Sequence, residues 1–223
     1  MRRVGVVIFP GSNCDLDAIR AVQDVMKAEA VPLWHQDSTL SVDAVILPGG
    51  FSYGDYLRPG AIASHSPIMQ AVIRFASGGG PVIGICNGFQ ILTESGLLPG
   101  TLLRNTTTRF ISKDIPLIVH SNQTPFTRHF QIGQHIVFPI AHKDGNYQVD
   151  SSTLHAMIDN HQVVFRYAEN PNGSIENIAG ICNASHNVVG LMPHPERALS
   201  DWTRTTDGIQ LFQSLRSYLE EQK

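Results

Sequence analysis

The sequence predicts an α/β fold with a largely parallel sheet, helices on both faces, and antiparallel strands in the second half of the chain. Two observations predict this fold. Short apolar runs alternate with helix-like periodicity through the first half of the chain, whereas from residue 101 onward similar runs are separated by turn-rich segments. No linker-like or low-complexity stretch divides the chain, so residues 1–223 are interpreted as a single domain.

Four apolar runs in the first half have the length of strands. The first is β-branched and aromatic and ends at Pro10 and Gly11. A continuous run of this kind is typical of a strand that is buried on both faces, as in a parallel sheet. The predicted strands of this half are residues 4–9, 32–35, 44–47 and 82–85.

Apolar residues between these strands recur at the spacing of amphipathic helices. The first predicted helix spans residues 15–30, with Asn13 or Asp15 as its N-cap. Two further helices are predicted at residues 67–76 and 87–95. Strands that alternate with helices in this way imply βαβ units and a parallel sheet.

The second half contains shorter apolar runs between segments that are rich in turn-forming residues. This sequence pattern favours antiparallel strands that pack beside the parallel sheet or extend it. The predicted strands are residues 117–119, 135–138, 163–167, 178–181 and 188–192, and an amphipathic helix is predicted at residues 207–221.

Composition excludes several classes of protein. Of the 223 residues, 42% are hydrophobic and 16% charged, and the formal net charge of −3 argues against a nucleic-acid partner. No apolar run reaches the roughly 18 residues of a transmembrane helix, so no membrane association is expected. Three cysteines do not make a disulfide framework and fit a reducing cytosol, which predicts a cytoplasmic protein.

The segment Gly84-Ile85-Cys86-Asn87-Gly88 has the pattern of a nucleophile elbow, with cysteine in place of serine. It lies between a predicted strand and a predicted helix, where a sharp turn lifts the side chain out of the sheet. A helix N-terminus also favours the thiolate form of a cysteine. The sequence therefore predicts Cys86 as a nucleophile, with the backbone N–H of Asn87 as one donor to an oxyanion.

The other two cysteines match the elbow pattern less well than Cys86. Cys182 repeats the first residues of the elbow but lacks the second glycine and the following helix, so we expect a structural role. Cys14 also follows a strand and begins a helix, which makes it a rival nucleophile. Asp15 and Asp17 beside it disfavour a thiolate there.

A cysteine nucleophile needs a base that a third group orients. His194 is the best of the ten histidines, because Pro193 and Pro195 restrain its backbone and Glu196 follows two residues later. Glu196 can then hold the imidazole through its second nitrogen. No histidine pair with a third partner has the spacing of metal ligands, so no metal is predicted.

A glycine-rich loop at residues 48–60 follows the third predicted strand. It lacks the Gly-Lys-Ser/Thr ending of a P-loop and the spacing of a dinucleotide-binding loop. At the carboxyl edge of a parallel sheet, Gly50 is placed to donate a second backbone N–H to the oxyanion.

These segments resemble the class I, triad-type glutamine amidotransferases, which have a flavodoxin-like fold. The elbow, the Pro48-Gly49-Gly50 loop and the late Pro193-His194-Pro195-Glu196 occur in the order typical of that family. Further segments resemble a subgroup of the family that serves purine biosynthesis, and together they span the chain. They are residues 49–60, 139–142, 145–147, 177–183 and 192–197.

The resemblance assigns roles to particular residues of this chain. It implies Cys86 as the nucleophile, His194 as the base and Glu196 as the orienting acid. The implied oxyanion donors and glutamine-binding residues are Gly50, Asn87, Phe51, Ser52 and Gln90.

The resemblance also implies a reaction and partners. L-Glutamine is hydrolysed through a thioester, and ammonia passes to a large ATP-dependent synthetase subunit that converts formylglycinamide ribonucleotide to its amidine in de novo purine (IMP) biosynthesis. A small bridging subunit completes the complex, and ATP and Mg²⁺ belong to the synthetase, so no cofactor is expected in this chain. Two alternatives stay open: a stand-alone γ-glutamyl cysteine hydrolase, and a non-catalytic glutamine-binding regulatory subunit.

Overall fold

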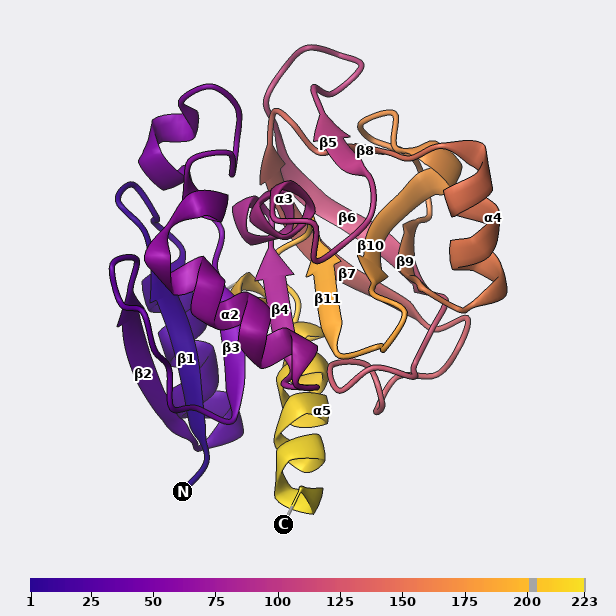
Figure 1. Cartoon of the computed structure of the whole chain (residues 1–223). Helices are drawn as coiled ribbons and strands as arrows, with labels where there is room; N and C mark the ends of the chain where they lie inside the picture. Colours follow the sequence, from indigo (N-terminus) through magenta and orange to yellow (C-terminus); the bar gives the residue numbers. More distant parts are fainter. Residues whose placement is uncertain (201–203, 223) are drawn as a thin grey trace.

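The computed structural model describes residues 1–200 and 204–222. Among these residues, a nine-stranded mixed sheet runs through the molecule in the order β2-β1-β3-β4-β11-β10-β9-β6-β7 (Figure 1). A second, two-stranded sheet pairs β5 (Thr101–Leu103) with β8 (Asn146–Gln148). The strands of the large sheet are β1 (Arg3–Ile8), β2 (Glu29–Trp34), β3 (Ala44–Leu47), β4 (Val82–Ile85), β6 (Ile111–Val119), β7 (His135–His142), β9 (Val163–Tyr167), β10 (Ile178–Cys182) and β11 (Val188–Leu191).

The predicted α/β fold is confirmed, and the antiparallel strands extend the parallel sheet rather than packing beside it. Strands β2, β1, β3, β4 and β11 are parallel neighbours, and β10, β9, β6 and β7 continue in antiparallel fashion. The exception is β11, which we expected among the antiparallel strands but which pairs in parallel with β4. The hairpin between β10 and β11 reverses the chain, and this reversal brings β11 back in the direction of β4.

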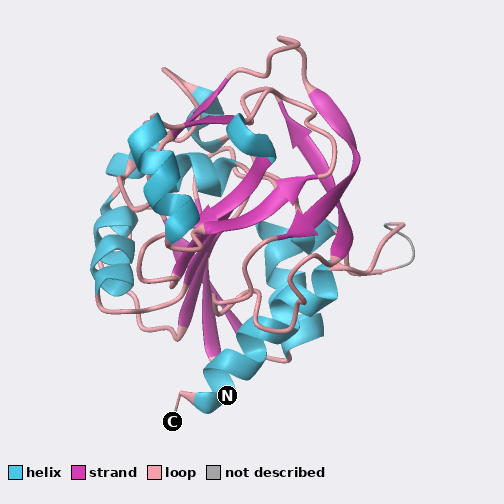
Figure 2. Cartoon of the chain, turned by 90° about the vertical axis from the view of Figure 1, so that its right-hand side faces the viewer, coloured by secondary structure: helices cyan, strands magenta, loops and turns pink. Residues whose placement is uncertain are grey.

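Helices lie on both faces of the sheet (Figure 2). The connection from β1 to β2 and the connection from β3 to β4 run in opposite directions along the sheet, so right-handed crossovers place their helices on opposite faces. None of the helices in the described ranges is long and apolar enough to cross a membrane. The helices are α1 (Asp15–Arg20), α2 (Pro67–Ser77), α3 (Asn87–Glu94), α4 (Ser151–Asp159) and α5 (Gly208–Glu221), and a π-helical segment η1 (Ala21–Met26) continues α1.

The first helix differs from its prediction at both ends. It ends near Met26 rather than at residue 30, because Lys27 adopts a left-handed conformation with φ of 52° and the chain enters β2 at Glu29. Its N-cap position is held by Cys14 without a side-chain cap, so neither Asn13 nor Asp15 serves as expected.

Three elements of the second half were not predicted, namely β5, β8 and α4. A signal for α4 exists in the sequence, because the Asp150 side chain accepts a hydrogen bond from the N–H of Thr153 as an N-cap does. Strands β5 and β8 have only three residues each, which is too short for a recognisable alternation.

Buried residues from the parallel and antiparallel halves form one hydrophobic cluster. Strands β3, β4 and β11 are buried along their whole length, as expected for strands covered on both faces. Phe89 of α3 stacks on Tyr147 of β8, with ring centroids 5.8 Å apart. This contact joins the elbow helix to the smaller sheet.

Two glycines allow α3 to lie unusually close to the sheet. A Cβ atom on Gly84 would meet the backbone carbonyl of Gly88, and a Cβ atom on Gly88 would overlap the backbone carbonyl of Leu47 in β3. Because these contacts are with backbone atoms, no side-chain rotation can relieve them. The glycines on either side of Cys86 are therefore a packing requirement of this turn.

We expect Gly88→Ala to destabilise the fold by at least about 1–3 kcal/mol, the usual cost of overpacking a core. Urea unfolding followed by circular dichroism measures the change. Gly78→Ala is the control, because Gly78 has φ of −80° and an added Cβ meets nothing closer than 3.4 Å. Equal stability of the two variants would contradict the packing requirement.

Candidate active site

Four loops meet at the carboxyl edge of the parallel strands, where α/β sheets carry their sites. The loop after β1 carries Cys14 and the loop after β3 carries Gly50. Cys86 follows β4, and His194 follows β11. An isolated β-bridge joins Ser12 to Gly50 and so ties the first two loops together. These loops flank the point where the strand order reverses, between β1 and β3.

Cys86 occupies a strained turn between β4 and α3. Its backbone has φ of 51° and ψ of −104°, a conformation that costs a non-glycine residue about 1–3 kcal/mol. The turn is held by the N–H of Cys86, which donates to Leu191 O at 2.8 Å. The thiol faces the carbonyl of Ala141 in β7 at 3.7 Å and is 6% exposed.

His194 and Glu196 form a buried pair, and His194 lies beside this thiol. His194 Nδ1 donates to Glu196 Oε1 at 2.6 Å, which leaves Nε2 for the thiol side of the ring. The backbone N–H of His194 donates to Pro139 O at 2.8 Å and fixes the segment between the two prolines. This is the contact that the predicted orienting role of Glu196 requires.

Electrostatics favour the charged form of His194. Burial by itself opposes the imidazolium, but the Glu196 carboxylate and the thiols of Cys86 and Cys14 raise the pKa of His194 well above its ordinary value. An imidazolium beside a cysteine stabilises the thiolate, which is the nucleophilic form. The arrangement thus has the geometry expected for the predicted nucleophile, proton carrier and orienting group.

Asn87 connects the two predicted oxyanion donors. Its side-chain Oδ1 accepts a hydrogen bond from the N–H of Ser52 at 3.1 Å, and its Nδ2 donates to Gln90 Oε1 at 2.9 Å. Its own backbone N–H begins α3 and therefore has no acceptor within the helix. Gly50, two residues before Ser52, has φ of 129°, a conformation that favours glycine. The side chain of Asn87 consequently sets how the loop of Gly50 lies against the elbow.

A cavity of about 160 Å³ opens above the thiol. Larger cavities occur elsewhere among the described residues, but they do not contain Cys86 or His194. The cavity beside Cys86 is bordered on its solvent side by Phe51 and Phe110, whose side chains are 44% and 50% exposed. The lining residues are Asn13, Cys14, Gly50, Phe51, Cys86, Phe110, Ala141, His194 and Arg197.

The structure separates the predicted glutamine-binding residues into two groups. Gly50 and Phe51 line the cavity. Ser52 and Gln90 are buried and do not line it, and both ends of the Gln90 amide are already bonded, to Asn87 and to Asp144 O. Phe110, Ala141 and Arg197 were not predicted in the lining. Phe110 comes from a segment without a motif, and although Ala141 and Arg197 lie in segments that resemble the family, nothing local to them indicates that they face the cavity.

The other two cysteines, Cys182 and Cys14, differ from each other in their surroundings, as their sequence contexts do. Cys182 is buried in β10, where it pairs with Val189 at the opposite end of β11 from the site, and burial raises the pKa of its thiol to about 12. This agrees with the predicted structural role. Cys14, the rival nucleophile, does line the cavity and its thiol faces His194. It lacks the strained strand-to-helix turn of Cys86. All three cysteines are free.

Comparison with known proteins identifies the family. The family of CobB/CobQ-like glutamine amidotransferase domains matches residues 1–219. This chain belongs to that family. The glutamine amidotransferase chain is 52% identical over 219 residues to the phosphoribosylformylglycinamidine synthase subunit PurQ of Alkaliphilus metalliredigens, and the match covers 98% of this chain and 97% of that one.

Solved structures of glutamine amidotransferases give the same picture. A chain in the structure of PurLQS from Thermotoga maritima matches with a TM-score of 0.91 and 47% identity, over 98% of this chain and 100% of that chain. The glutaminase domain of Trypanosoma brucei CTPS with bound acivicin matches with a TM-score of 0.61 over 97% of this chain and 94% of that chain. At 12% identity, this second likeness shows the fold alone.

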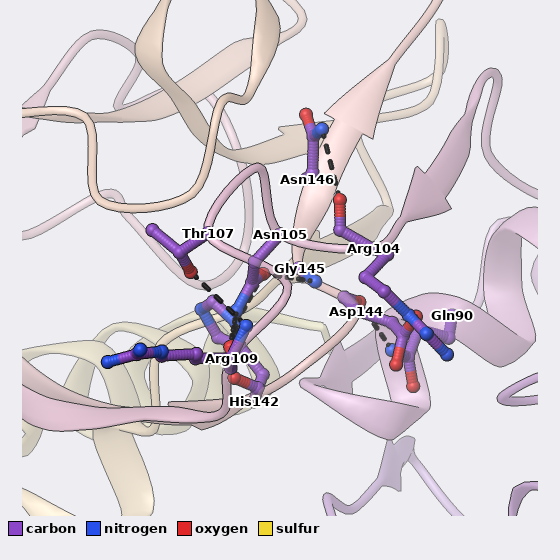
Figure 3. Close-up of polar contacts among 9 residues, drawn as sticks. All are labelled: Gln90, Arg104, Asn105, Thr107, Arg109, His142, Asp144, Gly145 and Asn146. Carbon is purple, nitrogen blue, oxygen red and sulfur yellow. Dashed lines mark hydrogen bonds and ion pairs between the residues drawn. The ribbon is translucent and has the colours of Figure 1, made fainter.

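Asn105 holds two loops of the amidotransferase together (Figure 3). Its Nδ2 donates to the carbonyls of Arg109 and His142, both at 3.0 Å. Its Oδ1 accepts from the N–H of Gly145 at 3.0 Å and contacts His142 Nδ1 at 3.1 Å. These bonds fix the end of β7, and with it Ala141, the residue whose carbonyl faces the Cys86 thiol.

His142, which this network holds in place, is neutral near pH 7. Because Oδ1 of Asn105 is an acceptor, Nδ1 of His142 carries the proton in this contact. Burial and the charge of His194 lower the pKa of His142 to about 4. His142 therefore does not compete with His194 for a proton near neutral pH.

We expect Asn87→Ala to lower kcat for glutamine hydrolysis by about 10²–10³-fold, the usual cost of losing one oxyanion donor. The backbone N–H of residue 87 remains, but the loop of Gly50 loses its tether through Ser52. Asn87→Asp is the matched variant, because it keeps an acceptor for the Ser52 N–H and should retain more activity. Steady-state kinetics that rank the aspartate variant at or below the alanine variant would contradict this role.

We expect Asn105→Ala to destabilise the chain by about 1–3 kcal/mol, since it leaves buried donors and acceptors without partners. Chemical unfolding measures the loss. Asn122→Ala is the control, because Asn122 makes a single side-chain bond, to Phe130 O at 3.2 Å. A loss of stability for Asn105→Ala no larger than that for Asn122→Ala would show that the two loops keep their positions without the Asn105 side chain.

Proposed function

We propose that this chain is the glutaminase subunit of phosphoribosylformylglycinamidine synthase. The observation that carries the proposal is the full-length similarity to a PurQ subunit, at 52% identity with 97% of the relative covered. The buried contact between His194 and Glu196 beside Cys86 supports the activity independently. Such a site is suited to acyl transfer from an amide to a thiol.

In the proposed reaction, the Cys86 thiolate attacks the side-chain carbonyl carbon of L-glutamine. The negative charge that develops on the oxygen is stabilised by the backbone N–H groups of Gly50 and Asn87. The imidazolium of His194 protonates the departing amide nitrogen, so ammonia leaves and a γ-glutamyl thioester remains. His194 then takes a proton from water, which attacks the thioester and releases glutamate and the Cys86 thiol.

The ammonia is used by partner subunits. The Thermotoga maritima relative was solved as PurLQS, and we assign the same assembly to this chain, with a large synthetase subunit and a small bridging subunit. The synthetase, with ATP and Mg²⁺, converts formylglycinamide ribonucleotide to formylglycinamidine ribonucleotide in de novo purine biosynthesis. The three free cysteines support a cytoplasmic location.

We expect Cys86→Ala to lower glutamine-dependent amidine formation by the reconstituted complex by about 10⁴-fold or more, because the nucleophile is lost. Synthesis from added ammonium chloride should persist, since the synthetase is untouched. Cys182→Ala is the control, because that thiol is buried away from the cavity. Retained glutamine-dependent synthesis in Cys86→Ala, or its loss in Cys14→Ala alone, would overturn the assignment of the nucleophile.

We expect Glu196→Gln to lower kcat for glutamine hydrolysis by about 10²–10⁴-fold, because an amide neither stabilises the imidazolium nor enforces the tautomer that leaves Nε2 free. Kinetics of the assembled complex measure the change. The substitution keeps the shape of the side chain, so a variant with unchanged kcat would show that Glu196 only fills space.

A further inference from the structure

Two thiols, not one, approach the imidazole of His194. Cys14 and Cys86 come from different loops, after β1 and after β4, and both thiols act on His194. Gly49 lies between them: a Cβ atom built there would be 2.7 Å from His194 Cε1, 3.2 Å from Cys14 Sγ and 3.4 Å from Cys86 Cβ. Cys14 and Cys86 are 2% and 6% exposed, so both thiols are held in a confined space.

The second ring nitrogen of His194, Nε2, points into this group. Nδ1 is bonded to Glu196. Nε2 is buried, and no acceptor or donor among the described residues lies within regular hydrogen-bond geometry of it. Ligand atoms of Cys14, His194 and Glu196 all lie within 4.8 Å of one another, and the Cys86 thiol adjoins this group through its own contact with the His194 ring. The proposed glutaminase mechanism uses Cys86, His194 and Glu196 but gives no role to Cys14.

We propose that the cavity binds a thiophilic divalent cation of the Zn²⁺ class, through Cys14 Sγ, Cys86 Sγ and His194 Nε2, and that the bound ion blocks glutamine hydrolysis. Thiolate sulfur and imidazole nitrogen are the ligands that Zn²⁺ prefers. Glu196 acts as the outer carboxylate that holds the other nitrogen of a zinc-bound histidine. The inhibitory part of this proposal rests on the proposed function, while the binding part does not.

Charge balance supports a dication here. Binding releases the Nε2 proton of the His194 imidazolium and any proton on the two thiols, and the two thiolates then neutralise the two charges of the ion. Arg197, whose guanidinium is paired with Asp17 at 2.9 Å, lies near Cys14 and opposes any cation that the thiolates do not compensate. The thiol of Cys14 gives up its contact with Asn13 Oδ1, at 3.2 Å, when it takes the ion.

Sequence spacing gave no sign of such a site. The prediction that no metal binds considered histidine pairs close together in sequence, whereas these ligands lie on three separate loops. Only the fold brings residues 14, 86 and 194 to one cavity.

Titration of the reduced, metal-free chain with Co²⁺ tests binding without any reference to catalysis. We expect one equivalent to produce the near-ultraviolet charge-transfer band of a thiolate–cobalt bond, and Zn²⁺ to displace it. Cys14→Ser should weaken binding by at least about 10–100-fold and reduce the band, and Glu196→Gln should weaken it by about 10–100-fold while keeping the band. Cys182→Ser is the control and should behave as the unsubstituted chain.

The effect on catalysis is measured in the reconstituted complex. We expect Zn²⁺ to inhibit glutamine-dependent synthesis but not synthesis from ammonia, EDTA to reverse the inhibition, and Cys14→Ser to require more Zn²⁺ for the same inhibition. Because that variant can alter the fold, its melting temperature is measured beside Cys14→Ala.

Three results overturn the proposal. They are a cobalt complex without a thiolate band, Cys14 variants that are folded and bind the metal as tightly as the unsubstituted chain, and inhibition that a thiol reductant reverses but EDTA does not. The last result indicates oxidation of Cys14 and Cys86 instead. Absence of glutamine-dependent synthesis in the metal-free complex contradicts the proposed function, while the cobalt titration still decides the metal site.

Discussion

The close packing of α3 against the parallel sheet is the constraint on which the site depends. Because Gly88 has no side chain, the helix backbone approaches the carbonyl of Leu47 directly. This approach forces the chain through a sharp turn at Cys86, whose backbone has a positive φ of 51°. The strain is local, and the buried strands on both sides hold it. The thiol of Cys86, the proposed nucleophile, is thus presented at the edge of the sheet by the same packing that forms the core.

A second consequence of this packing is a buried group of ionisable side chains. His194 and Glu196 are 2% and 4% exposed, so their interaction is screened little by solvent. The carboxylate raises the pKa of the imidazole, and the thiols of Cys86 and Cys14 on the other side of the ring act in the same direction. Proximity to Cys14 follows from the same geometry, because β1 and β4 both end at this edge of the sheet.

Polar side chains behind the cavity convert separate loops into one rigid wall. Asn87 joins the loop of Gly50 to the elbow, and Asn105 joins the end of β7 to the loop before β6. Both asparagines are 1% exposed and use donor and acceptor together. A side-chain amide is suited to this task, because it satisfies N–H and carbonyl groups at once without burying a charge.

Local patterns in the sequence were sufficient for the parallel strands, the elbow and the pairing of His194 with Glu196, because each depends on residues that are neighbours in the chain. Long-range pairing was not predictable: only the fold sets β11 parallel to β4 and turns the Gln90 amide away from the cavity toward Asp144. The neighbourhood of Cys14 is the clearest case. The sequence made this cysteine a rival nucleophile whose thiolate Asp15 and Asp17 disfavour, but it could not show that the thiol faces His194, 180 residues later in the sequence. Contacts between distant segments arise from how the sheet brings its strand ends together, and no local propensity encodes them.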